Sequence, residues 1–263
     1  MSDSQQDKEF DVKDGGKMPF LAHLTELRRR LVICIIAIGV GFAVSYYFSK
    51  PIFRFMVTPL LDELPEGSNL IYTNLPEAFF TYLKIGLWGG VVLALPVIFH
   101  QLWGFIAPGL YRNERRYAFP FVIWSCLLFA VGAFFGYLIV FPFGFKFFLK
   151  FSDETIHALP AMSQYFSLSL KLLFGFGLIF ELPVIMVFLA RMGLVNARFL
   201  AKQRKYAFLL VFVVGAMLTP PDIISQLFMA GPLMILYEVS IMLVRMIQRK
   251  KEKEAGEEPA AEL

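Results

Sequence analysis

The feature that most constrains this chain is a series of long apolar stretches without a single charged residue. The longest covers residues 117–145, and shorter ones cover residues 31–48 and 85–99. A helix of about 20 apolar residues is long enough to cross the hydrocarbon core of a bilayer. Hydrophobic residues make up 57% of the 263 residues and charged residues only 17%, with a mean hydropathy of +0.63. The sequence therefore predicts an all-α integral membrane protein.

Prolines, glycines and charged residues divide the apolar sequence into six expected spans. Their predicted limits are residues 31–49, 76–107, 113–148, 164–191, 206–218 and 223–243. With an amphipathic segment before the first span, they form a single membrane domain over residues 19–247. The polar residues 1–18 and the charged residues 248–263 are predicted to be disordered cytoplasmic tails.

Lysine and arginine residues are unevenly distributed between the connections. Most of them lie in the two termini and in the connections after the second and fourth spans. The remaining connections contain only Lys50, Arg54, Lys146 and Lys150. Because basic residues collect on the cytoplasmic side of a membrane, both termini are predicted to be cytoplasmic.

The sequence contains none of the short motifs that mark common enzymes. There is no P-loop, dinucleotide fingerprint, nucleophile elbow or HExxH zinc motif, and the three histidines lack metal-ligand spacing. Cys34 and Cys126 both lie in apolar stretches, which does not indicate a disulfide framework. We therefore predict that the protein is not an enzyme and has no metal or cofactor.

One carboxylate, Glu181, lies deep within the fourth predicted span. An ionised carboxylate at that depth costs several kcal/mol unless it is paired, hydrated or protonated. We favour a functional role over the simpler alternative, a neutral carboxyl bonded to backbone or to a serine. A proton-coupled secondary transporter that uses Glu181 as a relay is the alternative function. It would need a second ionisable group at the midplane and an internal repeat, and the sequence shows neither.

Two further carboxylates, Glu26 and Glu114, lie beside arginines at the predicted cytoplasmic ends of spans. Each has a local explanation, because Glu26 can pair with Arg29 or Arg30 and Glu114 can stabilise a helix N-terminus. A purely structural scaffold would need no more than this. Together with aromatic residues such as Phe105, the two carboxylates could instead receive a basic peptide, since arginine pairs strongly with carboxylates.

Several motifs follow one another along most of the chain. They are HLTELRRRL at 23–31, QLWGFIAPGLYRNERR at 101–116, FP at 141–142, FELP at 180–183, LTPPD at 218–222 and LYE at 236–238. In sequence, order and spacing they resemble the TatC family, the core subunits of the twin-arginine protein translocase.

The resemblance implies six transmembrane helices in a concave, glove-like bundle in the bacterial inner membrane, with both termini cytoplasmic. It implies that the chain binds twin-arginine signal peptides of folded precursors and nucleates a translocation complex driven by the proton-motive force. The implied partners are TatA- and TatB-type single-span subunits, other copies of the chain, and the lipid bilayer. Nucleic acid and cofactors are not expected.

The resemblance also assigns roles to single residues. The signal-peptide site would comprise Glu26 and Glu114, with Phe105 and Arg28 in the same cytoplasmic patch.

Three more residues carry over from the family pattern. Glu181 would lie in the concave face, where it would meet a polar residue of a single-span partner or hydrate and thin the bilayer. Pro59 would lie in a periplasmic cap, and Asp222 in the turn between the last two spans. Both would have structural or assembly roles, and Asp222 could simply cap the sixth helix.

Overall fold

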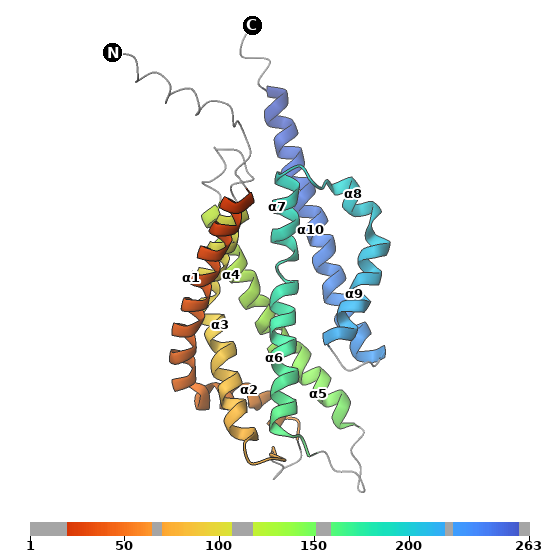
Figure 1. Cartoon of the computed structure of the whole chain (residues 1–263). Coiled ribbons are helices and arrows are strands. Elements are labelled where there is room, and N and C mark those ends of the chain that lie inside the picture. The colour runs from red at the N-terminus through yellow and green to blue at the C-terminus, as the bar shows by residue number, and fades with distance from the viewer. Residues whose placement is uncertain (1–19, 65–69, 107–117, 151–158, 219–222, 258–263) are drawn as a thin grey trace, which may run out of the picture.

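The computed structural model describes residues 20–64, 70–106, 118–150, 159–218 and 223–257. This part of the chain is helical apart from turns and one isolated bridge between Ile71 and Ala161. The α-helices, labelled in Figure 1, are α1 (Phe20–Tyr47), α2 (Ser49–Leu61), α3 (Glu77–Ile106), α4 (Ala118–Phe135), α5 (Phe141–Leu149), α6 (Met162–Ile179), α7 (Leu182–Arg191), α8 (Ala197–Lys202), α9 (Arg204–Leu218) and α10 (Ile223–Glu257). A short π-helix, η3 (Gly136–Val140), lies between α4 and α5. The prediction of an all-α protein is confirmed.

Within the described residues, 5 helical segments are long and apolar enough to cross a membrane. They are His23–Tyr47, Glu77–Ile106, Phe119–Leu149, Met162–Arg191 and Met229–Arg249. They correspond to the first four predicted spans and the sixth. The predicted fifth span is α9, which has 15 residues. At this length it rises about 22 Å, less than the roughly 30 Å of a hydrocarbon core, so its crossing stays a prediction.

The helices form a row in which each packs mainly on its neighbours. The α1 helix packs on α3, α3 on α4 and α6, and α4 on α6, while α10 packs on both α7 and α9. The α1 and α9 helices lie at opposite ends of this row, and α1 begins at the same end of the molecule at which α10 finishes (Figure 1). The side of the membrane to which that end belongs stays a prediction.

Two of the long spans are irregular where proline removes a backbone donor. The α4 helix passes through the π-helix η3 before α5, whose first turn contains Pro142. The α6 and α7 helices are separated at Phe180 and Glu181, directly before the Pro183 turn. Both interruptions fit the missing N–H of proline and its clash with the preceding turn.

The charged C-terminal stretch differs from its prediction. The α10 helix continues to Glu257, so residues 248–257 are helical rather than disordered. Arginine, lysine, glutamate and alanine are good helix formers, and here they extend a helix that is already nucleated. Residues 258–263 and the N-terminal tail at 1–18 lie outside the described residues.

The α1 and α3 helices approach so closely that backbone meets backbone. A Cβ atom added to Gly41 would lie 2.5 Å from the Gly90 carbonyl oxygen, and one added to Gly90 would lie 2.4 Å from the Phe42 nitrogen. Helices in lipid associate through such small residues, because close backbone approach increases van der Waals contact. The two glycines therefore fix how α1 lies on α3.

At the start of α3, the Glu77 side chain joins this helix to the preceding turn and to α6. Its Oε2 accepts hydrogen bonds from the backbone N–H of Thr73 at 2.6 Å, from the Thr73 hydroxyl at 2.9 Å and from the N–H of Asn74 at 3.3 Å. Its Oε1 accepts from the N–H of Ser163 in the first turn of α6 at 2.8 Å. The carboxylate thus satisfies a donor that the start of α6 would otherwise leave unpaired.

We predict that Gly41→Ala destabilises the protein, because the new methyl group has no space against the Gly90 carbonyl. Overpacking of this kind costs about 1–3 kcal/mol. Gly39→Ala is the matched control, since a Cβ atom there meets nothing within 4 Å. Thermal unfolding in detergent micelles should show a lower midpoint for Gly41→Ala alone. Equal midpoints for the two variants would contradict the packing argument.

Candidate functional site

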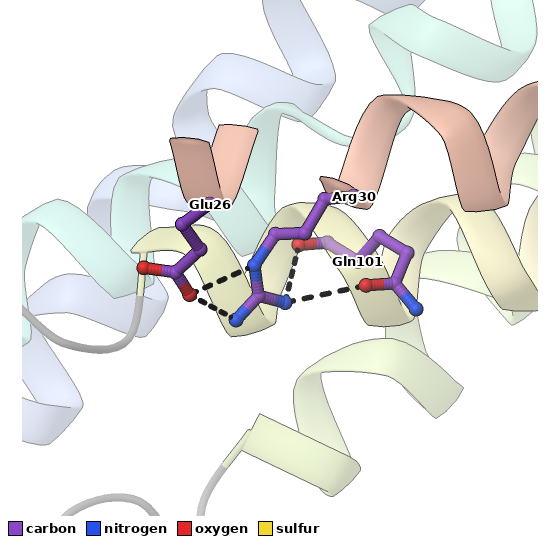
Figure 2. A network of polar contacts seen from close by, with 3 residues as sticks. All are labelled: Glu26, Arg30 and Gln101. Atoms are coloured by element: carbon purple, nitrogen blue, oxygen red, sulfur yellow. Dashed lines mark hydrogen bonds and ion pairs between the residues drawn. The ribbon is translucent and has the colours of Figure 1, made fainter. Parts of the chain in front are cut away.

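The candidate site lies where the first turns of α1 meet the last turns of α3. Glu26 and Arg30 are four residues apart on α1 and therefore share one face of the helix. The Arg30 guanidinium donates to Glu26 Oε1 through Nη2 at 2.6 Å and through Nε at 3.0 Å (Figure 2). The two side chains are 22% and 32% exposed, so the pair is partly shielded from solvent.

Arg30 also connects α1 to α3. Its Nη1 donates to the backbone carbonyl of Gln101 and to the Gln101 side-chain oxygen, each at 3.3 Å (Figure 2). Gly104, one turn further along α3, leaves room for the guanidinium, because a Cβ atom there would lie 2.5 Å from Nη1. A single arginine therefore holds a carboxylate of one helix against the end of another.

An aromatic pair lies at the same junction. The rings of His23 on α1 and Phe105 on α3 are stacked, with centroids 4.3 Å apart and planes inclined by 19°. The structure thus brings Glu26 and Phe105 to one place, as expected. Arg28 lies exposed on α1, and the arginine that pairs with Glu26 is Arg30. The local pairing that the sequence offered for Glu26 is confirmed.

Two predicted site residues lie outside the described residues. Glu114 falls within 107–117, and Asp222 falls within 219–222. The proximity of Glu114 to Glu26 and the position of Asp222 in its turn therefore stay predictions. His23, Arg30 and Gln101 were not among the predicted binding residues. The i, i+4 spacing of Glu26 and Arg30 was the one signal that could have singled out Arg30.

Glu181 lies at the break between α6 and α7 and is 4% exposed. Its Oε1 has no hydrogen-bond partner in the described structure. On the neighbouring spans, Ser125 Oγ of α4 accepts a hydrogen bond of 3.1 Å from Trp103 Nε1 of α3.

Glu181 is largely enclosed between helices. Its expected place in a concave face stays a prediction, and so does the simpler alternative, a neutral carboxyl bonded to backbone or to a serine. Whether the group also acts in function stays a prediction.

Pro59 lies buried inside α2, where it cannot donate to the carbonyl four residues earlier. That carbonyl belongs to Phe55, and it accepts a hydrogen bond of 2.6 Å from the Tyr137 hydroxyl instead. The next carbonyl, of Met56, accepts one of 2.5 Å from Tyr165. Two tyrosines from other helices therefore support α2 around its proline.

A family profile described as "Sec-independent protein translocase protein (TatC)" matches residues 22–232, most of the chain. The chain belongs to the TatC family. Similar proteins include "Sec-independent protein translocase protein TatC" of Desulforapulum autotrophicum, 52% identical over 95% of this chain and 92% of the relative. The protein of the same name from Escherichia coli K12 is 40% identical over 86% of this chain and 88% of its own length.

Solved TatC structures have the same fold. A crystal structure described as "Twin Arginine Translocase Receptor- TatC" superimposes with a TM-score of 0.75 at 41% identity, covering 84% of this chain and 97% of the other. A second crystal structure, in the detergent DDM, gives a TM-score of 0.77 at 40% identity. This TatC-family chain is thus a membrane protein of a protein-transport family.

The support of α2 in this TatC-family chain can be tested at Tyr137. Tyr137→Phe should leave the Phe55 carbonyl without its donor and cost about 1–3 kcal/mol of stability. Pro59→Ala supplies a backbone N–H for the same carbonyl, so the cost of Tyr137→Phe should shrink in that background. A double-mutant cycle of unfolding measures the coupling. Strict additivity of the two substitutions would show that they do not share this carbonyl.

Proposed function

We propose that this TatC-family chain is the core subunit of a twin-arginine translocase. In this proposal it binds the paired arginines of signal peptides on folded precursors at the α1–α3 junction. The observation that carries the proposal is the contact of Arg30 with Glu26, in which a carboxylate already accepts two donors of a guanidinium group. A peptide arginine offers the same fork of donors, and such pairing is strong and geometrically selective.

The proposal requires an exchange, because Glu26 is occupied by Arg30. A partly exposed ion pair at i, i+4 spacing contributes only about 0.3–0.5 kcal/mol, so a peptide arginine can displace it at little cost. The second peptide arginine would pair with Glu114. The stacked His23 and Phe105 rings offer an apolar surface beside the charges. Neighbouring arginines such as Arg28 would repel cationic segments that lack the correct spacing.

The membrane arrangement in this proposal is that of the family. The α9 helix forms a sixth span with local thinning of the bilayer, and the helices enclose a concave face. Both termini are cytoplasmic, in a bacterial inner membrane, as the distribution of basic residues favours. The proton-motive force supplies the energy.

The proposed partners are TatA- and TatB-type single-span subunits and further copies of the chain. Glu181 would take part in a contact within the membrane. A carboxyl group at that depth is costly, and ionisable residues found inside spans are therefore usually functional. Pro59 and Asp222 would serve structure or assembly.

We expect Glu26→Gln to weaken binding of a synthetic twin-arginine signal peptide roughly ten- to a hundredfold. The reason is that a charge-assisted hydrogen bond contributes about 1.5–3 kcal/mol. Glu114→Gln should act in the same direction, and so should replacing the arginine pair of the peptide by glutamine. Binding to full-length protein in nanodiscs, followed by fluorescence anisotropy, measures the effect.

The matched control is Glu238→Gln. Like Glu26, Glu238 is partly exposed and pairs with an arginine, with its Oε1 2.7 Å from Arg204 Nε. This pair joins α10 to α9 and not α1 to α3. Its removal should leave peptide binding unchanged. Parent-like binding by both Glu26→Gln and Glu114→Gln would disprove the proposed site.

Arg30 gives a prediction of the opposite sign. If Arg30 competes with the peptide for Glu26, Arg30→Gln should tighten peptide binding by roughly two- to threefold, which corresponds to the small free energy of the internal pair. Arg29→Gln changes the net charge equally on the exposed side of α1 and serves as the control. Weaker binding by Arg30→Gln would instead mean that Arg30 orients Glu26 for the peptide.

A further inference from the structure

We propose that α8 and the adjoining ends of α9 and α10 form a binding surface for the headgroups of anionic phospholipids. The surface comprises Arg198 and Lys202 of α8, Lys205 of α9, and Arg245 and Arg249 of α10, and we call it the α8 basic surface. All five side chains are exposed. The proposal does not depend on the binding of signal peptides.

The charge of this part of the chain is almost entirely positive. Residues 191–205 contain five basic residues and no acidic one. Glu238 of α10 is already paired with Arg204, with Oε1 2.7 Å from Nε and Oε2 2.8 Å from Nη2. Residues 250–257 contain three lysines and three glutamates, so they add no net charge. The five cations of the α8 basic surface form no ion pair with another residue that the structure describes.

Two hydrogen bonds join α8 to α10. The Ala197 N–H donates to Gln248 Oε1 at 3.1 Å, and the Tyr237 hydroxyl donates to the Leu200 carbonyl at 2.8 Å. Ala197 and Gln248 are each followed by an arginine of the α8 basic surface, so the two helices bring their cations to one place. Because α8 is fixed at two points, a ligand would not have to order the backbone that carries these cations.

The groups available to a ligand are side chains, and the N-terminus of α8 is already in use. The Phe199 N–H donates to Asn196 Oδ1 at 2.7 Å, and the Ala197 N–H is bonded to α10. Arg198 and Lys202 are four residues apart and therefore share one face of the helix. An anion would thus meet two exposed cations on one fixed face.

The α8 basic surface lies at the depth of the lipid headgroups. The candidate spans that flank α8 both end at basic residues, Met162–Arg191 before it and Met229–Arg249 beside it. Both hydrogen bonds of α8 to α10 fall within the second of these spans, and Figure 1 shows α8 at the same end of the molecule as the last turn of α7. Leu194 and Phe199 are exposed beside the cations. Apolar and basic side chains together at this depth fit a membrane surface of negative charge.

The test is native mass spectrometry of the full chain released from nanodiscs with equal amounts of phosphatidylglycerol and phosphatidylcholine. The parent protein should retain more phosphatidylglycerol than phosphatidylcholine. The double variant Arg198→Gln, Lys202→Gln should lower this ratio roughly fivefold for each cation removed, because each cation adds attraction to the anionic headgroups. An unchanged ratio would overturn the proposal.

The matched control is the double variant Lys50→Gln, Arg54→Gln. These two cations of α2 are also exposed and four residues apart, and they too form no ion pair among the described residues. Their removal should leave the ratio at the parent value. The exchange Arg198→Lys, Lys202→Arg keeps both charges and should do the same. An equal loss in the α2 variant would reveal a general effect of net charge and contradict a site at α8.

The fixed position of α8 is tested at Gln248. Gln248→Leu removes the acceptor of the Ala197 N–H and leaves every charge in place. The ratio should fall, by less than on loss of one cation, because α8 keeps its bond to Tyr237. A parent-like ratio would disprove the contribution of this bond.

Inorganic phosphate distinguishes a lipid surface from a simple anion site. An excess of phosphate at constant ionic strength should leave the retained phosphatidylglycerol unchanged, since the ion has no apolar part to contact Leu194 and Phe199. Displacement of the lipid by phosphate would mean an anion site only and would overturn the assignment to phospholipid.

Discussion

The contact on which the candidate site depends is the backbone approach of Gly41 and Gly90. Arg30 lies eleven residues before Gly41, and Gln101 lies eleven residues after Gly90. Eleven residues are about three helical turns, so Arg30 lies on the same face of α1 as Gly41, and Gln101 lies on the same face of α3 as Gly90. Because the two helices are antiparallel, Arg30 and Gln101 therefore face each other. The Arg30 guanidinium then reaches both Gln101 oxygens. Larger residues at the crossing would move the α1 end away from α3 and open the junction.

A second constraint comes from the membrane, where a backbone group without a partner is expensive. The chain meets it with side chains from neighbouring helices. Tyr137 donates to the carbonyl that Pro59 leaves free, and Glu77 accepts from the first turn of α6. These bonds are made between helices and so also fix their relative positions. In this protein, the side chains that satisfy backbone groups at interruptions and ends of helices also hold neighbouring helices together.

The sequence predicted the parts of the fold that depend on local composition. Uncharged stretches located the spans. The sequence also offered Arg29 or Arg30 as a local partner of Glu26, and Arg30 is the one that pairs with it. The sequence could not predict contacts such as that of Glu77 with Ser163, 86 residues apart, because these depend on how helices pack. Polar composition favoured disorder after residue 247, whereas the helix propensity of the same residues extends α10.

The hydrogen bond between Trp103 and Ser125 has a consequence for proton movement. A proton wire needs every member to accept one proton and release another. The indole of Trp103 has a donor but no acceptor, so no proton can pass through it to Ser125 from the α3 side. A small-solute carrier that moved protons through this part of the protein would need another path.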